Sequence, residues 1–240
     1  MAGFFSDQVQ FFVAGSELGS ATTKACVRLV NNPLDVTAFL NNAEKQNPNV
    51  RSDAIEWAGF FDDASRSIDG LMSGSIGTVG DVVSFAVGTA IGKRAYSAKV
   101  QWRSVGIPIR VKDMVRVESV WQPDGTISVA KHFGTPTSTT AEVNSGSIDD
   151  SAASTGTGTV FIHITRYVNS PTFTAYLMDS ADGTTFAVKS GVFIPTGTGA
   201  TALEFTGTLR RYVRFIFNNF STGSGSPSGT ATMWVSYVRP

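Results

Sequence analysis

Short runs of β-branched and aromatic residues, in which apolar and polar positions alternate, dominate the last third of the chain. Turn residues such as Asp182-Gly183 and Thr196-Gly197 separate these runs. The predicted strands are Val160–Arg166, Thr172–Met178, Phe186–Ile194, Ala202–Thr206, Arg211–Asn218 and Ala231–Arg239. Short strands at this spacing, with few charged residues among them, are typical of a β-sandwich or barrel.

The first half of the chain has the same alternation with one helical interruption. Its predicted strands are Gln8–Ala14, Thr23–Val30, Ala54–Phe61, Asp81–Val87, Tyr96–Arg103 and Ile109–Trp121. Asp62 or Asp63 is placed to cap a helix that runs to about Met72, because apolar residues recur there at three- and four-residue spacing. The fold class is therefore mostly β, all-β or α+β, with one flanking helix.

Two polar stretches divide this pattern. Residues 32–53 are rich in asparagine and predict a long loop, a feature that is usually functional in a compact domain. We expect this loop to reach a neighbouring subunit, with Phe39 and Leu40 as apolar anchors. Residues 134–158 are rich in Ser, Thr, Gly and Ala and predict a linker, within which Thr139–Val143 is a candidate strand. These features divide the chain into domain 1–133 and domain 134–240.

Composition narrows the possible functions. Charged residues make up 16% of the 240 residues, against a usual value of about 25%, and 19 basic residues balance 19 acidic ones. The chain lacks the basic excess that marks a nucleic-acid binder. The single cysteine, Cys26, excludes an internal disulfide and is expected to be a buried, inert thiol. Neither a signal peptide nor an apolar run of about 18 residues is expected.

The sequence contains several incomplete chemical motifs. The stretch Gly88–Lys93 has three residues between its glycines, whereas a phosphate loop needs four, so a turn between strands is the better interpretation. His132 and His163 lack zinc-type partners, and Asp179–Gly183 lacks the closing Glu of a calcium loop. The adjacent carboxylates Asp62-Asp63 are predicted at a helix start and Asp149-Asp150 in a loop. Adjacent residues on a strand point in opposite directions, so neither pair can flank one substrate bond. We therefore predict no catalytic, cofactor-binding or metal-binding residues, and no enzyme.

Two groups of residues remain as candidates for assembly contacts. Phe4 and Phe5 lie in a terminal arm, where exposed phenylalanines would favour aggregation unless they dock on a neighbour. Arg210, Arg211 and Arg214 form the concentrated basic group of the C-terminal region. Arg214 alternates with apolar residues and so faces away from the predicted core, where it is either solvated or paired with an acidic residue of another subunit.

The order of several short motifs resembles the tail tube (major tail) proteins of long non-contractile bacteriophage tails. In the first half these motifs are Asp35–Phe39, Ile55–Asp63, Ile68-Asp69 and Asp81–Phe85 followed by Gly88. In the second half, Asp179–Phe186, Thr206–Arg214 and Ser236–Arg239 resemble the β-sandwich appended to many such proteins. Each motif is structural, and none is a catalytic signature.

The resemblance implies a tube-like β-sandwich or barrel with a flanking helix, followed by a C-terminal β-sandwich on the tube exterior. Copies would form hexameric rings, and the rings would stack into a conduit through which genomic DNA leaves the head without sequence-specific binding. The loop 32–53 would contact the adjacent ring. The implied partners are further copies and other phage tail proteins, the implied location is the tail of the virion, and synthesis would take place in the host cytoplasm.

Two other classes of function stay open at this stage. One is a capsid decoration protein or another virion accessory protein. The other is a carbohydrate-binding β-sandwich module, because sandwiches with exposed Trp and Tyr bind sugars. The size of the assembly separates them, since rings or tubes indicate the tube, trimers indicate decoration, and a glycan-binding monomer indicates the module.

Overall fold

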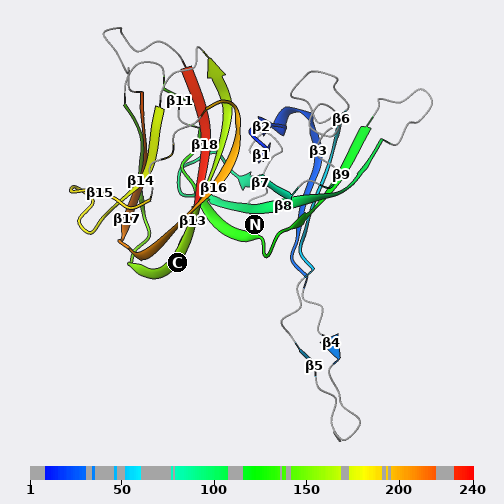
Figure 1. Cartoon of the computed structure of the whole chain (residues 1–240), viewed down its shortest axis with the longest axis horizontal. Coiled ribbons are helices and arrows are strands. Elements are labelled where there is room, and N and C mark those ends of the chain that lie inside the picture. The colour runs from blue at the N-terminus through cyan, green and yellow to red at the C-terminus, as the bar shows by residue number, and fades with distance from the viewer. Residues whose placement is uncertain are drawn as a thin grey trace, which may run out of the picture. The chain divides into compact units, whose positions relative to one another are not determined.

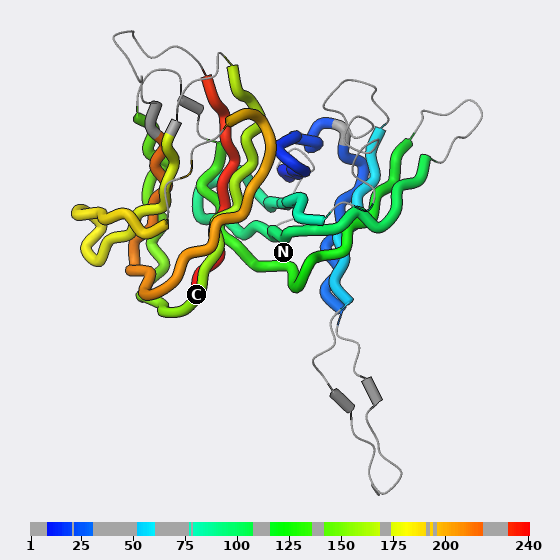
Figure 2. The backbone as a smooth tube through the Cα atoms, in the orientation of Figure 1, coloured from blue at the N-terminus to red at the C-terminus, as the bar shows by residue number. Residues whose placement is uncertain are grey.

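The fold is known from a computed structural model of the 240-residue chain (Figures 1 and 2). The residues that the structure describes are 9–30, 34–35, 46–47, 52–60, 77, 79–107, 116–135, 137–138, 142–168, 173–190, 193, 196–219 and 230–240. Nearly all regular elements among them are antiparallel strands, so the predicted mostly-β fold class is confirmed.

The elements follow one another along the chain in the order in which Figure 1 labels them. They are β1 (Val9–Val13), β2 (Ser16–Glu17), the 3₁₀ turn η2 (Gly19–Ala21), β3 (Thr22–Arg28), β4 (Leu34–Asp35), β5 (Gln46–Asn47), β6 (Ala54–Phe60), β7 (Val79–Val87), β8 (Arg94–Gly106), β9 (Arg116–Pro123), β10 (Ser128–His132), β11 (Thr137–Ser138), β12 (Val143–Asp149), β13 (Ser154–Val168), β14 (Phe173–Ser180), β15 (Ala187–Val188), β16 (Gly199–Leu209), β17 (Tyr212–Asn219) and β18 (Thr230–Val238).

The chain divides into two compact units. Unit 1 comprises Met1–Ser20, Asp81–Ser97 and Ser128–Pro240, and unit 2 comprises Ala21–Gly80 and Ala98–Ile127. The predicted boundary at residue 134 lies within unit 1, which also includes segments from before that boundary. Independent folding of residues 134–240 stays a prediction.

Unit 1 contains a β-sandwich. Strands β16, β13 and β18 are neighbours in one sheet, and β12, β17, β14 and β15 form the other. In Figures 1 and 2 the red strand β18 runs beside β13, in agreement with their antiparallel register. The core between the two sheets consists of apolar side chains from both: Phe133, Ile148, Val160, Ile162, Ile164, Ala175, Leu177, Phe205, Leu209, Val213, Phe215, Phe217, Ala231, Met233, Val235 and Tyr237. Burial of this apolar surface is the main force that holds the two sheets together.

The opposite face of β18 supports a second core within unit 1. The first sheet continues from β18 through β10, β8, β7, β1 and β2. Trp234 of β18 stacks on Phe12 of β1 with ring centroids 4.9 Å apart, and Ala86, Ala95 and Ala130 complete this second core. Because both faces of β18 are covered, its sequence is a nearly continuous apolar run with little alternation.

The turn between β1 and β2 closes over β13 and β16. Gly15 in this turn has a positive φ of 84°, and a Cβ atom there would lie 2.3 Å from the carbonyl oxygen of Gly199. Its backbone N–H donates to Nδ1 of His163 on β13, at 3.3 Å. Glycine is therefore required at this position for two reasons, the backbone conformation and the close approach.

His163 is the end of a buried hydrogen-bonded chain. Since Gly15 donates to Nδ1, the ring proton lies on Nε2, which donates to Oγ of Ser84 at 2.9 Å. Ser84 and Ser97 share a hydrogen bond of 2.8 Å, and Ser97 and Ser236 one of 3.0 Å. All four side chains have zero exposure to solvent. This Ser–His contact therefore joins strands β7, β8, β13 and β18 inside the fold and is not open to a substrate.

We expect this burial to make unfolding pH-dependent. Burial lowers the pKa of His163 to about 3 and also lowers the pKa of His132. An unfolded histidine protonates at a pKa of about 6.5, so the unfolded state binds more protons below that pH. The free energy of unfolding is expected to fall by up to about 1.4 kcal/mol per pH unit for His163 as pH drops from about 6.5 towards 3.

Urea unfolding between about pH 6.5 and pH 4.5 measures this slope, in a range above the pKa of most carboxyl groups. The matched variant His163→Gln removes the titrating ring, so its slope should be shallower even if its absolute stability is lower. An unchanged slope in the variant would contradict the assignment.

Unit 2 contains strands in the order β3, β6 and β9, with residues 100–106 of β8 paired with β9. Ile55, Trp57 and Gly59 of β6 share one buried face, as the alternation predicts. Trp102 and Trp121 meet edge to face with centroids 5.1 Å apart. With Trp57, they are among the largest fully buried side chains of the chain.

Several sequence predictions need correction in the structure. The predicted linker 134–158 is wrong, because it contains β12 and the start of β13. Polar residues form strands here because their side chains find partners: Oγ of Ser145 accepts from the N–H of Phe215 at 3.0 Å. The predicted strand Phe186–Ile194 is reduced to β15 and an isolated bridge between Phe193 and Ala175.

Other differences are smaller. Strand β10 was not predicted, because it is short and Thr126–Lys131 lacks a marked apolar run. The stretch 32–53 contains the short pair β4–β5. Cys26 is partly exposed, not buried, because it lies on β3 at the edge of its sheet. The predicted helix from Asp62 or Asp63 lies outside the described residues, as do residues 109–115 of the predicted strand Ile109–Trp121.

Candidate interaction site

The predicted assembly residues fall into two groups in the structure. Phe4, Phe5, Phe39 and Leu40 lie outside the described residues. Their docking on a neighbour stays a prediction. The arginines follow strand β16 or lie on β17 and are all described, so their contacts within the chain can be compared with the predicted contacts to another subunit.

Arg210 and Arg211 are engaged within their own chain. Nε and Nη2 of Arg211 donate to the two carboxylate oxygens of Asp149 at 2.7 and 2.6 Å. This contact lowers the pKa of Asp149 to about 2. The backbone N–H of Arg210 donates to Asp179 at 2.9 Å, and its Nε lies 3.9 Å from the same carboxylate. Both side chains stay about half exposed, so these surface pairs contribute little to stability.

Arg214 lies on the outer face of β17, as its alternation with Val213 predicts. Its guanidinium carbon is 3.9 Å from the centre of the Phe186 ring, and Nη2 lies 3.8 Å from Sδ of Met178. A guanidinium over an aromatic face at this distance is a cation–π contact. Arg214 therefore contacts an aromatic ring of its own chain and is not part of the Arg211–Asp149 pair.

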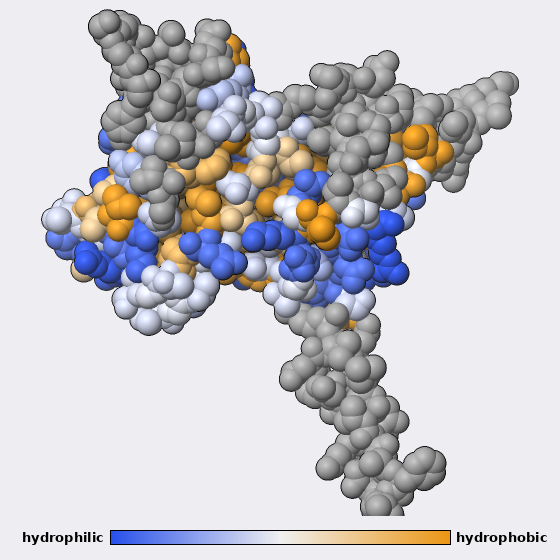
Figure 3. All heavy atoms as spheres, viewed as in Figure 1, coloured by the Kyte–Doolittle hydropathy of each residue, from blue (hydrophilic) through white to orange (hydrophobic). Residues whose placement is uncertain are grey.

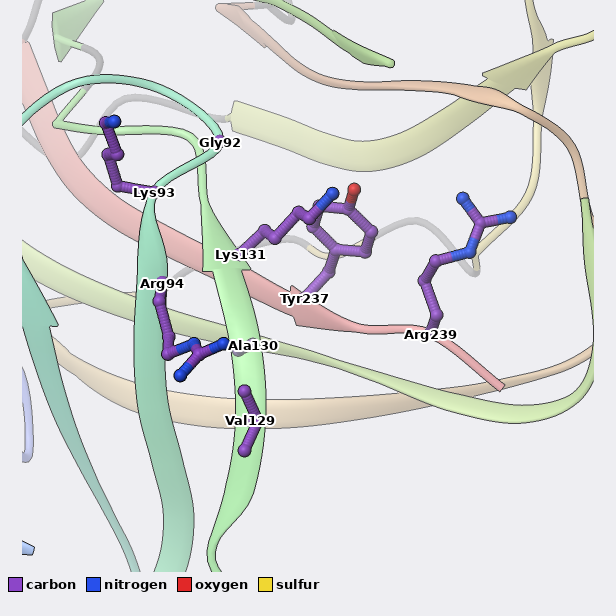
Figure 4. Close-up of a pocket in the computed structure, with 8 residues that line it drawn as sticks. All are labelled: Gly92, Lys93, Arg94, Val129, Ala130, Lys131, Tyr237 and Arg239. Atoms are coloured by element: carbon purple, nitrogen blue, oxygen red, sulfur yellow. The ribbon is translucent and has the colours of Figure 1, made fainter. Parts of the chain in front are cut away.

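A basic pocket of about 450 Å³ opens elsewhere on unit 1. Strands β8, β10 and β18, with the turn before β8, supply its walls (Figure 4). The lining residues are Gly92, Lys93, Arg94, Val129, Ala130, Lys131, Tyr237 and Arg239. Figure 4 shows Lys131 and Tyr237 side by side on neighbouring strands, in agreement with their direct antiparallel pairing. We call this surface the basic pocket.

A buried carboxylate organises part of the basic pocket. Asp150, whose side chain is 3% exposed, accepts from Nζ of Lys131 at 2.5 Å and from the hydroxyl of Tyr237 at 2.6 Å. It also accepts from Nη1 of Arg239. Burial, together with the hydrogen bond to Asp150, raises the pKa of Tyr237, so the phenol keeps its proton and remains a donor. Asp150 thus holds three pocket side chains in one arrangement.

Arg239 fastens the end of the chain to this arrangement. Its Nε donates to Oγ of Ser154 at 2.9 Å, and Nη2 donates to the carbonyl oxygens of Ala152 and Leu209 at 2.8 and 2.9 Å. These bonds join β18 to the start of β13 and the end of β16. The role of Arg239 is therefore mainly structural, and its guanidinium forms an ion pair with Asp150.

Lys93 and Arg94 form no ion pair with any residue in the described part of the chain. Arg94 lies directly opposite Lys131 in the β8–β10 ladder. Like charges at opposite positions destabilise a sheet. Lys93 and Arg94 of the basic pocket are therefore available to bind an anionic group from outside the chain.

The sequence contained only a partial signal for this pocket. Lys93 and Arg94 lie at the end of the stretch whose glycine spacing does not fit a phosphate loop. The structure confirms that this stretch is the turn between β7 and β8. Asp150 was predicted to lie in a loop and does follow the last residue of β12. Lys131 and Arg239 were not singled out, because only the pairing of β10 with β18 brings them together.

Other surfaces of the described residues are less distinctive. A second pocket of about 100 Å³ lies on unit 2 between Lys24, Glu56 and Glu118. On the face shown in Figure 3, hydrophobic and hydrophilic residues are interspersed. Among the described residues there is no group of His, Cys, Asp and Glu side chains placed to hold a metal ion. No helix within the same residues is long and apolar enough to cross a membrane.

Comparisons with known proteins give weak similarities only. No family model matches the chain, and no curated protein matches it. A chain from the tail of an empty gene transfer agent particle is 16% identical over 53% of this chain and 98% of that one, with a TM-score of 0.35. The Dit protein of phage SPP1, described as a paradigm of the hub adsorption apparatus, is 11% identical over 95% of this chain and 98% of that one. The TM-score is 0.36.

A third similar structure is the sheath/tube terminator of an extracellular contractile injection system, PVC. It is 7% identical over 54% of this chain and 97% of that one, with a TM-score of 0.42. Identities below 25% with TM-scores below 0.5 describe a likeness of backbone course, and no statement about function follows from them.

Proposed function

We propose that this chain is a structural subunit of a phage-type tail that assembles into stacked, hexameric rings around a conduit for DNA. The observation that carries the proposal is the ordered set of sequence motifs that resembles tail tube proteins. Where the structure describes these motifs, they lie on strands and turns: residues 55–60 lie on β6, 81–85 on β7, and 206–214 span β16 and β17. This placement supports their interpretation as structural motifs.

The chemistry of the described residues supports a role without catalysis. Their Ser84–His163 contact is fully buried, and the exposed Arg211–Asp149 pair is satisfied within the chain. In the proposed assembly, DNA passes through the lumen without sequence-specific contacts, and the chain is located in the tail of the virion with other tail proteins as partners.

The carbohydrate-binding alternative loses part of its support. It depends on exposed Trp and Tyr, and all four tryptophans of the chain, Trp57, Trp102, Trp121 and Trp234, are buried to 2% exposure or less, whereas four of the five tyrosines are partly exposed. Sugar-binding surfaces need an accessible aromatic face. A virion accessory role, such as capsid decoration, stays the second candidate within the structural class.

Sedimentation velocity of the purified chain across the micromolar range tests the proposal. Rings or larger stacks are the expected species, because a subunit with so many strand edges is stabilised by partners that cover them. A discrete trimer would favour decoration instead. A monomer at every concentration would contradict the proposed assembly.

A further inference from the structure

We propose that the basic pocket receives carboxylate side chains from a second copy of this chain and so forms a subunit contact. This inference rests on the proposed function and identifies a surface of the assembly that the sequence did not single out. Three properties of the pocket carry it: its charge, its prearranged walls, and its combination of apolar and charged lining.

The pocket has an excess of positive charge. Lys93, Arg94, Lys131 and Arg239 line it, and Asp150 is the one carboxylate bonded to them, so these five side chains leave a net of three positive charges. Arg94 faces Lys131 across the ladder and has no anionic partner within the described residues. An external carboxylate would relieve this repulsion, and the gain is larger in a concave site than on an open surface.

The walls of the pocket are prearranged for such a contact. Asp150, which also accepts from the hydroxyl of Tyr237, holds Lys131, whose side chain is still 43% exposed and keeps donors for a ligand. Because an ammonium has three N–H donors and Asp150 takes one of them, Lys131 can bond a second carboxylate without breaking the first contact. Less conformational freedom is lost on binding when the cations are already held in place.

The apolar part of the lining indicates a polypeptide side chain as the occupant. Val129 is 52% exposed at the pocket. A bare inorganic ion would leave this apolar surface and most of the 450 Å³ in contact with water. The methylene groups of a glutamate or aspartate, with their neighbours along a chain, would cover it.

The same chain carries suitable carboxylates. Because its net charge is zero, the excess in the pocket is balanced elsewhere on the molecule. Five exposed acidic residues have carboxylates with neither an ion pair nor a hydrogen bond within the described chain: Glu17, Glu118, Asp124, Glu142 and Glu204. When copies associate head to tail, unpaired cations on one copy can form ion pairs with unpaired carboxylates on the next. A head-to-tail interface is also the geometry that closes a ring.

Charge reversal at Arg94 tests this contact. Arg94→Glu places an acid opposite Lys131, which favours the fold of the strand pair, so a loss of assembly cannot be ascribed to unfolding. We expect the concentration needed for ring formation to rise at least about tenfold, the change that a 1.4 kcal/mol loss of contact energy produces. The matched control is Arg103→Glu, an exposed arginine of β8 that does not line the pocket, which should assemble like the wild type.

Complementation identifies the partner residue. Lysine variants of the five exposed carboxylates are each mixed with Arg94→Glu, and one of these mixtures should restore rings that neither variant forms alone. Assembly of Arg94→Glu at wild-type concentration, or failure of every mixture, would overturn the inference and leave the proposed function intact. Wild-type protein that stays monomeric would contradict both.

Inorganic phosphate serves as the probe for a free anion. Under the inference, phosphate competes only weakly with assembly beyond the effect of ionic strength, which a matched chloride solution measures. Tight phosphate binding that is lost in Arg94→Glu, with ring formation unchanged, would assign the pocket to a small anion and overturn the subunit contact.

Discussion

Replacing Trp234 with alanine is expected to lower the free energy of unfolding by about 3–5 kcal/mol, the usual cost of deleting a fully buried aromatic side chain. Trp234 has zero exposure and stacks between Phe12 and His132, with centroid distances of 4.9 and 5.8 Å. Its Nε1 donates to Oε1 of Gln10 at 3.2 Å. The variant therefore loses packing on three strands and leaves a cavity beside the buried histidines.

Denaturant unfolding followed by circular dichroism measures this loss. Trp234→Phe retains much of the ring and should cost less, and Val129→Ala, at an exposed position, should change stability by less than about 0.5 kcal/mol. Equal effects of Trp234→Ala and Val129→Ala would contradict the placement of Trp234 at the centre of the second core.

Replacing Asp150 with alanine is expected to cost a similar amount, about 3–5 kcal/mol, because it removes the shared partner of buried and half-buried donors. Lys131, Tyr237 and Arg239 all donate to this carboxylate. Without it, the hydroxyl of Tyr237 stays buried with no acceptor, and two cations face each other in the pocket. The change should also loosen the C-terminal end of β18.

The neighbouring residue provides the matched control. Asp149 is also a carboxylate paired with an arginine, but both partners are about 45% exposed. Asp149→Ala should therefore have a much smaller effect on the unfolding free energy than Asp150→Ala, measured by the same denaturant titration. Comparable losses from the two variants would show that Asp150 does not organise the pocket.

The comparison of sequence with structure shows which features depend on local pattern. The strands with strict alternation or β-branched runs, such as β6 and β7, were predicted close to their observed bounds, whereas β13 begins six residues before the predicted Val160. Their periodicity reflects burial, which acts on each strand separately. The mostly-β class follows from the same pattern.

Features that depend on pairing between distant strands were missed. Val143–Asp149 was interpreted as part of a linker because its composition is polar, yet Ile148 lies in the sandwich core and Ser145 bonds to β17. The basic pocket is a similar case. Lys131 and Arg239 are far apart in sequence, and only the register Lys131↔Tyr237 makes them neighbours. No local pattern records that register.

The structure also changes the relative interest of the candidate arginines. Arg210, Arg211 and Arg214 are the most concentrated basic residues of the C-terminal region, but each has a partner within its own chain. Lys93 and Arg94 form an equally basic pair and have no anionic partner in the described part. For this reason we propose Lys93 and Arg94, ahead of the three arginines, as the basic residues of an assembly contact.

Negative-stain electron microscopy of the purified full-length chain tests the central claim most directly. Assembly into hexameric rings with a central opening, or into stacks of such rings, is the result that we expect at micromolar concentration. Monomeric particles without rings, in a sample that circular dichroism shows to be folded, would contradict the claim that this chain builds a tail.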